Sequence, residues 1–368
     1  MNLRRKRTLR KYKKHEYNPS APASGGNPMI SKNIMRDIVT NKKVTRTLVR
    51  VVPQDIRVGI TMGDPSGIGP EICAKAAKSL GKRFSLIIIG DRGVWERVSS
   101  AQSPVPSVEF ADLKNVNLKK FKFGQVKAEY GRASVEYLDK SREMLKSGKI
   151  DCVVTCPISK EAINLAGFHY SGHTEYFADK TKTKDVVMML VNKDLKFALV
   201  TRHIPLKEVA LRLNKVKIAK TITVCREALK ELFGLKDPRL VVCGINPHGS
   251  DNGLIGNEES QVIRPALQEL RKRFKYIDGP MGADVAIFKA RNKLYDCVIA
   301  MYHDQALIPL KLLGDETGVN ISLGLGIVRT SPLHGTAFDI AGKNIASPES
   351  LNAAIRLAAQ CAFNQKKA

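Results

Sequence analysis

Residues 57–71, RVGITMGDPSGIGPE, decide the fold class, because a short apolar strand runs through a glycine-rich turn into a helix. Pro70 suits the first turn of that helix. Glycines at 63, 67 and 69 let the backbone approach a ligand, and a helix N-terminus favours an anion. The spacing matches neither the dinucleotide-binding fingerprint nor a P-loop. A tight strand-to-helix turn without a ligand is therefore an equal alternative.

The same alternation continues along the chain. Apolar runs such as SLIIIG (85–90), DCVVTC (151–156), RLVVCGI (239–245), DCVIAMYH (296–303) and VNISLG (319–324) predict strands, and VVMMLV with FALVT predicts a strand pair. Amphipathic stretches at 134–148, 216–233, 258–274 and 348–363 predict helices. Continuous apolar strands between helices are typical of parallel strands covered on both faces. We therefore expect an α/β architecture.

The composition is that of a globular protein of about two domains. The chain has 368 residues, of which 43% are hydrophobic and 26% charged, which excludes a wholly disordered chain. No apolar run is long enough to span a membrane, and the basic N-terminus reaches no apolar signal region. Seven cysteines without a C-x-x-C pair predict buried free thiols in a reducing compartment. We expect a cytoplasmic protein with no membrane partner.

Residues 1–55 are predicted to be a basic, flexible extension. Residues 1–50 carry +12 of the total net charge of +26, and residues 18–28 are rich in Pro, Gly, Ser and Ala. Such an arm suits nucleic acid or another anionic surface. The alternatives are a solvated tail, a true start at Met29 or Met35, and a transit peptide.

Histidines recur among polar residues at the ends of the apolar strands. They are His173, His203, His248, His303 and His334. Open α/β sheets place ligands at the carboxyl ends of strands. Three imidazoles from His203, His248 and His303 would leave open positions on a metal, as in a catalytic site, with Asp304 as a further ligand or a support. Ordinary polar loop residues are the alternative.

Residues 311–343 set polar side chains in a glycine-rich frame. Lys311, Asn320 and Arg329 are three of them. Lys and Arg suit a phosphate or a carboxylate, and Arg binds bidentately. Because VNISLGLGIVRTS is otherwise apolar, Arg329 needs a partner there. A set of surface charges is the alternative.

Taken in order, these motifs resemble the 4-hydroxythreonine-4-phosphate dehydrogenase family of pyridoxal phosphate biosynthesis, from about residue 56 to 363. The motifs are GDPSGIGPE, SGHTEYFA, TRHIPL, GINPHG, GPMGAD, MYHDQALIPLK and GVNISLGLGIVRTSPLHGTAFDIAGK. The resemblance implies a two-domain isocitrate/isopropylmalate dehydrogenase-like fold, with the active site in the interdomain cleft and at the dimer interface. We expect residues 56–165 with 335–368 in one domain and 166–334 in the other.

The resemblance also implies the site residues. One divalent metal (zinc, magnesium, cobalt or manganese) is expected on His203, His248 and His303 of a homodimer with shared active sites. The expected substrate contacts are His173, Thr174, Lys311, Asn320 and Arg329. The loop 334–343 is expected to bind NAD or NADP through His334, Gly335, Thr336, Asp339 and Lys343. Asp284 and Asp304 are candidates to orient ligands or take the proton.

The implied reaction is the NAD(P)-dependent oxidation of 4-phosphooxy-L-threonine to 2-amino-3-oxo-4-phosphooxybutanoate, which decarboxylates to 3-amino-2-oxopropyl phosphate. The chain departs from the family's usual motifs in NPHGSD and at Ala306, Gly326 and Leu333. These departures leave open a sister activity on 4-phospho-D-threonate or 4-phospho-D-erythronate. An alternative of another class is a non-catalytic protein that binds nucleic acid through its basic arm.

Overall fold

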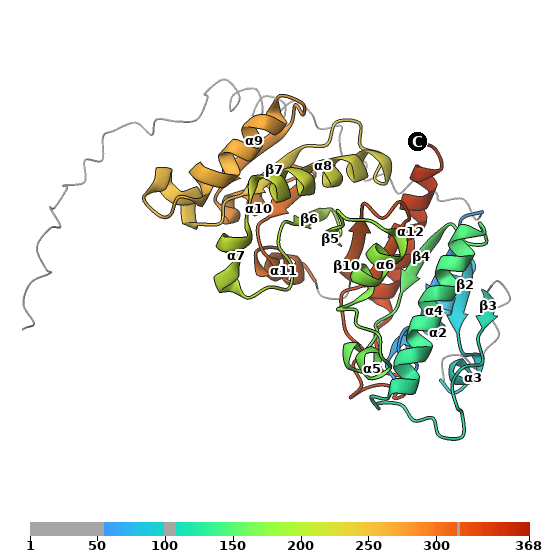
Figure 1. Ribbon diagram of the computed structural model, residues 1–368. Coiled ribbons are helices and arrows are strands. Elements are labelled where there is room, and N and C mark those ends of the chain that lie inside the picture. The colour runs from blue at the N-terminus through green and yellow to red at the C-terminus, as the bar shows by residue number, and fades with distance from the viewer. Residues whose placement is uncertain (1–54, 99–107, 315–316) are drawn as a thin grey trace, which may run out of the picture. The chain divides into compact units, whose positions relative to one another are not determined.

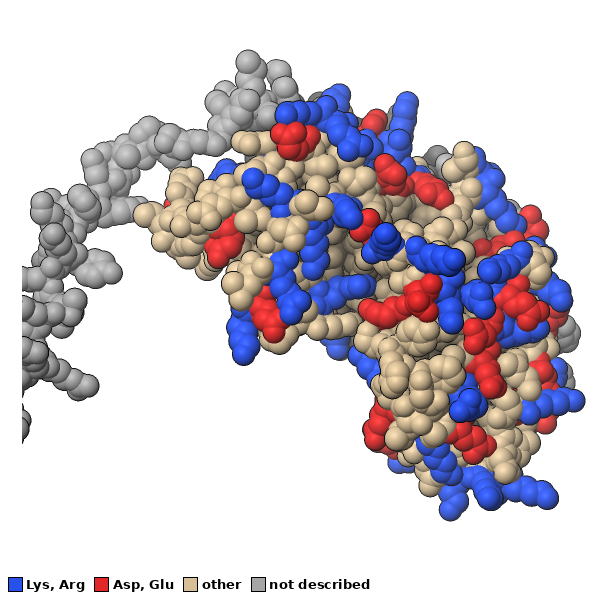
Figure 2. Space-filling view, viewed as in Figure 1, with Lys and Arg blue, Asp and Glu red and all other residues tan. Residues whose placement is uncertain are grey.

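The computed structural model describes residues 55–98, 108–314 and 317–368, and contacts within the chain gather Arg50–Ala368 into one compact unit. The predicted extension, residues 1–55, lies outside the described residues except for Asp55. Lys and Arg side chains are spread over the face shown in Figure 2, with Asp and Glu among them. Residues beyond the first fifty contribute +14 to the net charge, so the folded part is basic as well.

Among the described residues, eleven strands pair into one sheet. Figure 1 shows many of these strands and the helices beside them. The strands are β1 (Arg57–Thr61), β2 (Ser85–Gly90), β3 (Val108–Asp112), β4 (Cys152–Thr155), β5 (Val187–Asn192), β6 (Leu195–Leu199), β7 (Leu240–Cys243), β8 (Ile277–Met281), β9 (Cys297–Ala300), β10 (Val319–Leu323) and β11 (Arg329–Pro332). The α-helices are α2 (Gly69–Leu80), α3 (Arg92–Trp95), α4 (Ala128–Lys146), α5 (Lys160–Leu165), α6 (His173–Thr181), α7 (Leu206–Arg212), α8 (Lys215–Glu231), α9 (Arg264–Arg271), α10 (Ala283–Arg291), α11 (His303–Leu312) and α12 (Glu349–Gln365). Two shorter helical segments are η2 (Pro247–Gly253) and η3 (Glu259–Ile263).

The sheet is mixed, with a parallel group of strands on each side of an antiparallel centre. Its order is β3-β2-β1-β4-β11-β10-β5-β6-β9-β7-β8. The pairs on both sides are parallel, but β11–β10, β10–β5 and β5–β6 at the centre are antiparallel. The strand pair predicted from VVMMLV and FALVT is the hairpin β5–β6, where Asn192 pairs with Leu195 across two turn residues. A two-residue turn can join only antiparallel strands.

Helices cover both faces of each parallel group. Helix α4 packs on β1, β2 and β4, whereas α12 packs on β4 and β11 and against α2. In the other group, α8 contacts β5 and β6, while α10 and α11 contact β7, β9 and β6. Alternate residues of a strand therefore enter different cores: Ile299 belongs to the larger buried cluster, and Val298 and Ala300 belong to the smaller one.

Local signals explain where several helices begin. Pro70 occupies the first turn of α2, where its missing N–H is no loss. The side chain of Ser159 accepts from the N–H of Ala162 at the start of α5, and Asn214 caps α8 in the same way. These caps place the residues that follow each strand at defined positions.

The predictions of buried thiols and of no membrane span can both be compared with the structure. All seven cysteines are buried and free, which confirms the first prediction. Among the described residues, no helix is long and apolar enough to cross a membrane.

Candidate active site

Three histidines follow three neighbouring strands. His203 lies four residues beyond the end of β6, His303 opens α11 just after β9, and His248 lies in η2 after β7. Because β9 pairs in parallel with both β6 and β7, the carboxyl ends of these strands lie at one edge of the sheet. The fold therefore brings the three predicted metal ligands to the same edge.

The rings of His203 and His303 lie close together, with their centroids 5.5 Å apart. Burial lowers the pKa of His203, and the charges of Lys160 and His303 lower it further. A neutral imidazole is the form that binds a metal. Nδ1 of His303 lies 2.6 Å from Oδ1 of Asp304, which orients that ring.

The donor set fits a transition metal better than magnesium, because imidazole suits zinc or cobalt whereas Mg²⁺ prefers oxygen ligands. Across residues 55–98, 108–314 and 317–368, no three His, Cys, Asp or Glu side chains are grouped closely enough to hold an ion. Within a single chain, His203 and His303 lie close together, and His248 follows a strand that ends at the same edge of the sheet.

The loop that carries His248 is held by a buried acid. Its backbone is left-handed, with φ of 55° at His248 and 72° at Ser250, a conformation that non-glycine residues adopt only when the surroundings impose it. Oε1 of the fully buried Glu259 accepts from the N–H groups of Ile245 and Asn246, both at 2.8 Å. Oε2 of Glu259 accepts from the side-chain amide of Asn246 at 2.9 Å.

Gln305 ties the turn after β7 to the turn after β9. Its Nε2 donates to the carbonyl of Gly244 at 2.8 Å, and its Oε1 accepts from the N–H of Met301 at 2.7 Å. These two hydrogen bonds connect the segment that leads to His248 with the segment that leads to His303.

Arg329 is a buried cation without a carboxylate partner among the described residues. It is 1% exposed on β11. Its Nε and Nη2 donate to Oγ1 of Thr155 at 3.1 and 2.6 Å, and its Nη1 donates to Oγ of Ser322 at 3.1 Å. Burial lowers the pKa of Arg329 to about 9. A buried charge that only hydroxyl groups contact calls for an anion.

His173, Thr174 and Asn320 lie around Arg329. Oγ1 of Thr174 is 3.3 Å from Oγ of Ser322, and Asn320 lies on the same face of β10 as Ser322. Burial, helped by the charge of Arg329, holds the pKa of His173 well below its usual value. Within the described ranges, Nε2 of His173 and Oδ1 of Asn320 are buried without a hydrogen-bond partner. Four of the five predicted substrate residues are thus brought together.

The fifth predicted substrate residue and one predicted acid are exposed. Lys311 lies in the last turn of α11, and Asp284 lies in the first turn of α10. No hydrogen bond or ion pair within the described ranges joins either side chain to Arg329 or to the histidines. Asp284 does lie beside the loop of His248: a Cβ added to Gly282 would be 2.9 Å from Oδ1 of Asp284 and 3.5 Å from Cα of His248.

The predicted cofactor loop, residues 334–343, packs against the glycine-rich turn. The N–H of Ile68 donates to the carbonyl of Thr336 at 3.0 Å, and a Cβ added to Gly67 would lie 3.0 Å from that same oxygen. Nδ1 of His334 donates to the carbonyl of Gly335 at 3.1 Å. Burial lowers the pKa of His334, and its buried Nε2 has no partner among the residues that the structure describes.

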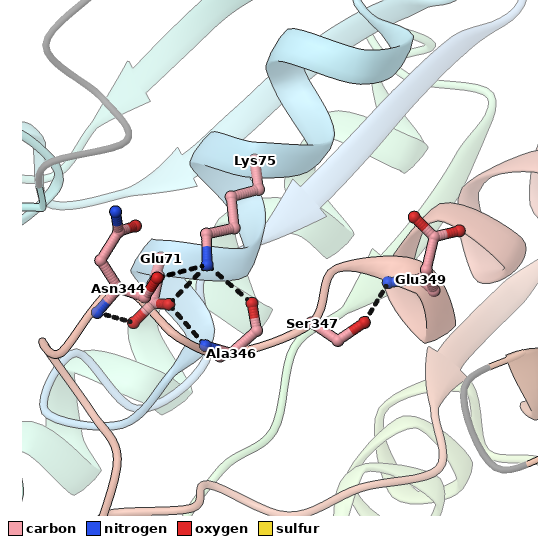
Figure 3. A network of polar contacts seen from close by, with 6 residues as sticks. All are labelled: Glu71, Lys75, Asn344, Ala346, Ser347 and Glu349. Carbon is pink, nitrogen blue, oxygen red and sulfur yellow. Dashed lines mark hydrogen bonds and ion pairs between the residues drawn. The ribbon is translucent and has the colours of Figure 1, made fainter.

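The last two predicted cofactor residues, Asp339 and Lys343, are exposed. The chain just beyond them is anchored to α2 (Figure 3). Glu71 accepts from the N–H of Ala346 at 2.8 Å and of Asn344 at 3.2 Å. Lys75 donates to Glu71 at 2.8 Å and to the carbonyls of Asn344 and Ala346 at 3.0 and 2.8 Å. The end of the loop is thereby fixed to the helix that follows the glycine-rich turn.

The turn itself contains a buried carboxyl group. Oδ1 of Asp64 accepts from the N–H of Ser66 at 2.9 Å, while its Oδ2 has no partner among the described residues. Burial raises the pKa of Asp64 to about 7. This group therefore titrates near neutral pH, in the turn against which the predicted cofactor loop packs.

Several residues that shape the site were not predicted from the sequence. They are Asp64, Glu71, Thr155, Glu259, Gln305 and Ser322. Asp64 and Glu71 lie inside the quoted glycine-rich stretch, and Thr155 ends an apolar strand, so their positions carried a signal. Glu259 and Gln305 read as ordinary polar residues of helices, and only their burial distinguishes them.

Comparisons with known proteins show what the chain as a whole is similar to. The family model described as pyridoxal phosphate biosynthetic protein PdxA matches residues 73–358. A 4-hydroxythreonine-4-phosphate dehydrogenase of Desulforapulum autotrophicum is 41% identical over 323 residues, covering 82% of this chain and 94% of the relative. A protein of Oceanobacillus iheyensis, named provisionally as a D-threonate 4-phosphate dehydrogenase, is 39% identical over 324 residues, covering 83% and 97%. The solved structure of 4-hydroxythreonine-4-phosphate dehydrogenase from Klebsiella pneumoniae has a TM-score of 0.76 at 35% identity, covering 83% of this chain and 99% of that one.

Proposed function

The chain belongs to the family of pyridoxal phosphate biosynthetic protein PdxA, and from this premise we propose that it oxidises 4-phosphooxy-L-threonine with NAD or NADP. Its relatives are named dehydrogenases, so the chain is an oxidoreductase. The proposed product is 2-amino-3-oxo-4-phosphooxybutanoate, which loses its carboxylate as CO₂ to give 3-amino-2-oxopropyl phosphate. This reaction belongs to pyridoxal phosphate biosynthesis.

One observation of the site carries this proposal. Arg329 is buried, its contacts are hydroxyl groups rather than carboxylates, and the unpartnered Nε2 of His173 and Oδ1 of Asn320 lie nearby. An anionic substrate with hydroxyl or amino groups would satisfy all three. Because the pKa of His173 is held low, its ring is neutral, and because one ring nitrogen already bonds to the backbone of Cys156, the unpartnered Nε2 is left to accept a hydrogen bond from the substrate.

We further propose that His203, His248 and His303 hold one divalent metal ion. A bound divalent ion acts as a Lewis acid and lowers the pKa of an alcohol. Asp304 holds the ring of His303, while Glu259 and Gln305 hold the loop of His248. Because the described residues of a single chain group no three such ligands, a second copy of the chain in a homodimer is proposed to complete the shared site.

The remaining predicted residues take supporting roles in the proposal. Lys160, whose charge acts on His203, and the exposed Lys311 would attract the phosphate of the substrate. Asp284 lies beside the loop of His248, and Asp304 contacts His303, so either carboxylate is placed to orient ligands or to take a proton.

The cofactor is proposed to bind along residues 334–343, through His334, Gly335, Thr336, Asp339 and Lys343. The nicotinamide ring supplies the hydride acceptor. The chain's own role is to fix this loop, through the contact between Ile68 and Thr336 and through the anchor at Glu71 and Lys75. We retain the expected division into residues 56–165 with 335–368 and 166–334 within this proposal, with the active site between the two domains. A cytoplasmic location is proposed from the seven free cysteines.

The second candidate is the oxidation of 4-phospho-D-threonate or 4-phospho-D-erythronate. The 39% identity to the provisionally named D-threonate 4-phosphate dehydrogenase favours it. Both candidate substrates present a phosphate and a carboxylate, so Arg329 suits either one. Steady-state rates of reduced cofactor formation with each substrate, compared as kcat/KM, distinguish the two proposals.

The alternative of another class, binding of nucleic acid by the basic arm, concerns residues outside the described ranges. Binding of RNA by the full chain and by a variant without residues 1–55, at two salt concentrations, tests it. Binding by an arm would weaken steeply with salt and disappear with the arm.

A further inference from the structure

We propose that Thr155 and Ser322 are positioning residues that hold Arg329 as an unpaired cation, ready to receive an oxyanion of the substrate. The proposal rests on the function proposed above and extends it to two residues that do not themselves have to touch the substrate. It follows from the place of Arg329 in the sheet, from its hydrogen bonds and from the charges around it.

The order of the strands explains how Arg329 is held. Strand β11, which begins with Arg329, lies between β4 and β10. Thr155 is the last residue of β4, and Ser322 lies on β10. The guanidinium therefore donates hydrogen bonds to both neighbouring strands, and the register of the sheet places both acceptors. Both hydroxyl-bearing residues are buried, at 0% and 1% exposure.

The hydrogen bonds fix the plane of the guanidinium and leave two of its N–H groups without an acceptor among the described residues. Oγ1 of Thr155 accepts from two nitrogens of Arg329, Nε and Nη2, and Oγ of Ser322 accepts from Nη1. An arginine has five N–H donors. Three have acceptors among the described residues, which leaves a single N–H on each terminal nitrogen without an acceptor there. Two donors, one on each terminal nitrogen, are the number that a bidentate contact with a carboxylate or a phosphate requires.

The hydroxyl groups preserve the positive charge. A carboxylate at either position would satisfy the same donors but would also neutralise Arg329 and compete with the substrate's anion. Hydroxyl oxygens accept the hydrogen bonds without a net charge. The hydroxyl groups therefore orient the guanidinium without reducing the positive charge that attracts an anion.

The side chains whose charges interact with Arg329 come from a single helix. Glu175 and His173, both of α6, interact with it electrostatically. Glu175 is itself within 3.7 Å of Arg202, so its charge is shared with another cation. The buried residues of β4, β10 and α12, the other elements packed against β11, include thiols but no charged side chain. The protein thus supplies no direct counter-ion among its described residues.

Ser322 also connects Arg329 to Thr174. Because the hydroxyl of Ser322 accepts from Arg329, its own proton is available to Oγ1 of Thr174, 3.3 Å away. Thr174 then keeps its own proton for an acceptor on the substrate. The chain of contacts from Thr155 through Arg329 and Ser322 to Thr174 thus orients two of the proposed substrate contacts together.

The test compares Thr155→Val, which removes only the hydroxyl, with Thr155→Ser, which keeps it. Ser322→Ala is the second variant. Thr330→Val is the matched control, because Thr330 is the next residue of β11 and its buried hydroxyl donates to the carbonyl of Ala354 at 2.9 Å, away from Arg329. All four are measured as metal-loaded enzymes with 4-phosphooxy-L-threonine and NAD or NADP.

We expect Thr155→Val to raise KM for the substrate about tenfold or more, with a smaller change in kcat and none in KM for the cofactor, because hydrogen bonds to a charged group are lost. Ser322→Ala should act in the same direction, and Thr155→Ser and Thr330→Val should leave KM unchanged. Equal effects of Thr155→Val and Thr330→Val would overturn the proposal.

A second experiment, which needs no substrate turnover, distinguishes failure of this proposal from failure of the proposed function. Thermal unfolding is followed with inorganic phosphate and, separately, with malonate as the carboxylate probe. Stabilisation of the wild-type protein by either probe, reduced in Thr155→Val but not in Thr330→Val, supports the anion role even if no candidate substrate turns over. The probe that stabilises identifies the oxyanion. If neither probe stabilises the wild-type protein, or if both variants respond alike, Thr155 does not prepare Arg329 for an anion.

Discussion

His203 and His303 lie with their ring centroids 5.5 Å apart, although one follows β6 and the other follows β9. The parallel pairing of Leu199 with Ala300 sets this relationship, because each histidine comes within four residues of that pair. His248 joins the same edge after β7, the next strand of the sheet. The proposed metal site would therefore need all three histidines as ligands, whereas the hydrophobic core includes none of them.

Replacing His303 with Ala is expected to remove the metal and the activity while leaving the fold intact. The imidazole contributes a proposed ligand, and the loss of Lewis-acid chemistry should lower kcat at least about a hundredfold. Metal content after dialysis, measured by mass spectrometry, checks the binding, and thermal unfolding checks the fold. His169→Ala is the control, because His169 is an exposed residue outside the site. Full turnover by His303→Ala in chelating buffer would contradict the assignment.

Replacing Glu259 with Gln is expected to loosen the loop of His248. The buried carboxylate accepts three hydrogen bonds there, one of them from the side-chain amide of Asn246, and an amide in its place brings two donors against one another. We expect the free energy of unfolding to fall by about 1–3 kcal/mol and the metal affinity to fall by about 10- to 100-fold. Urea unfolding and metal titration measure the two effects. Glu269→Gln, at an exposed pair with Lys272, should change neither, and equal effects of the two substitutions would refute the positioning role.

Replacing Lys75 with Met is expected to raise KM for the nicotinamide cofactor. Lys75 holds the carbonyls of Asn344 and Ala346, just beyond the proposed cofactor loop (Figure 3). The loss of these contacts should raise the cofactor KM roughly three- to tenfold, with little change in the KM of the substrate. Lys78→Met, one turn further along the same helix, is the control. A rise confined to the substrate KM would show that this anchor serves a different region of the site.

Asp64 predicts a specific dependence of stability on pH. Its folded pKa of about 7 lies above the unfolded value of 3.8, so the protonated carboxyl favours the folded state. That contribution is complete below the unfolded pKa and is lost as the pH rises through about 7. Asp64→Asn cannot ionise. The difference in unfolding free energy between wild type and variant should therefore shift in the variant's favour by about 1–4 kcal/mol between acidic and slightly alkaline pH. Parallel stability curves from pH 4 to pH 8 would contradict the burial of this carboxyl, whose Oδ2 has no partner among the described residues.

Much of the architecture could be predicted from local patterns. The strand at 57–61, the hairpin of β5 and β6 and the helix at 215–231 all carry periodicity or capping signals that act over a few residues. The antiparallel centre of the sheet was not predicted as such, because β11, the four-residue strand RTSP, has no apolar pattern of its own. Its pairing with β4 and β10 is decided by the sheet and not by local propensity.

Some residues of the candidate site could be predicted from the sequence, and others could not. The histidines after strands and the isolated Arg329 stand out, since polar groups in apolar surroundings require an explanation. Thr155, Ser322 and Glu259 do not stand out, because a threonine, a serine or a glutamate is common at any position. The contact of Thr155 with Arg329 spans 174 residues and becomes visible only when β4 and β11 are paired. The residues next to Thr155 in the sequence do not indicate a partner so far along the chain.

The rate at which the metal-loaded protein forms reduced NAD or NADP with 4-phosphooxy-L-threonine, compared with the rate with 4-phospho-D-threonate, tests the central claim most directly. We expect turnover with 4-phosphooxy-L-threonine at the higher kcat/KM, and its loss in Arg329→Met, which keeps much of the side chain's length but removes the buried charge. No reduced cofactor with 4-phosphooxy-L-threonine under conditions where 4-phospho-D-threonate is oxidised, or full activity of Arg329→Met, would contradict the account.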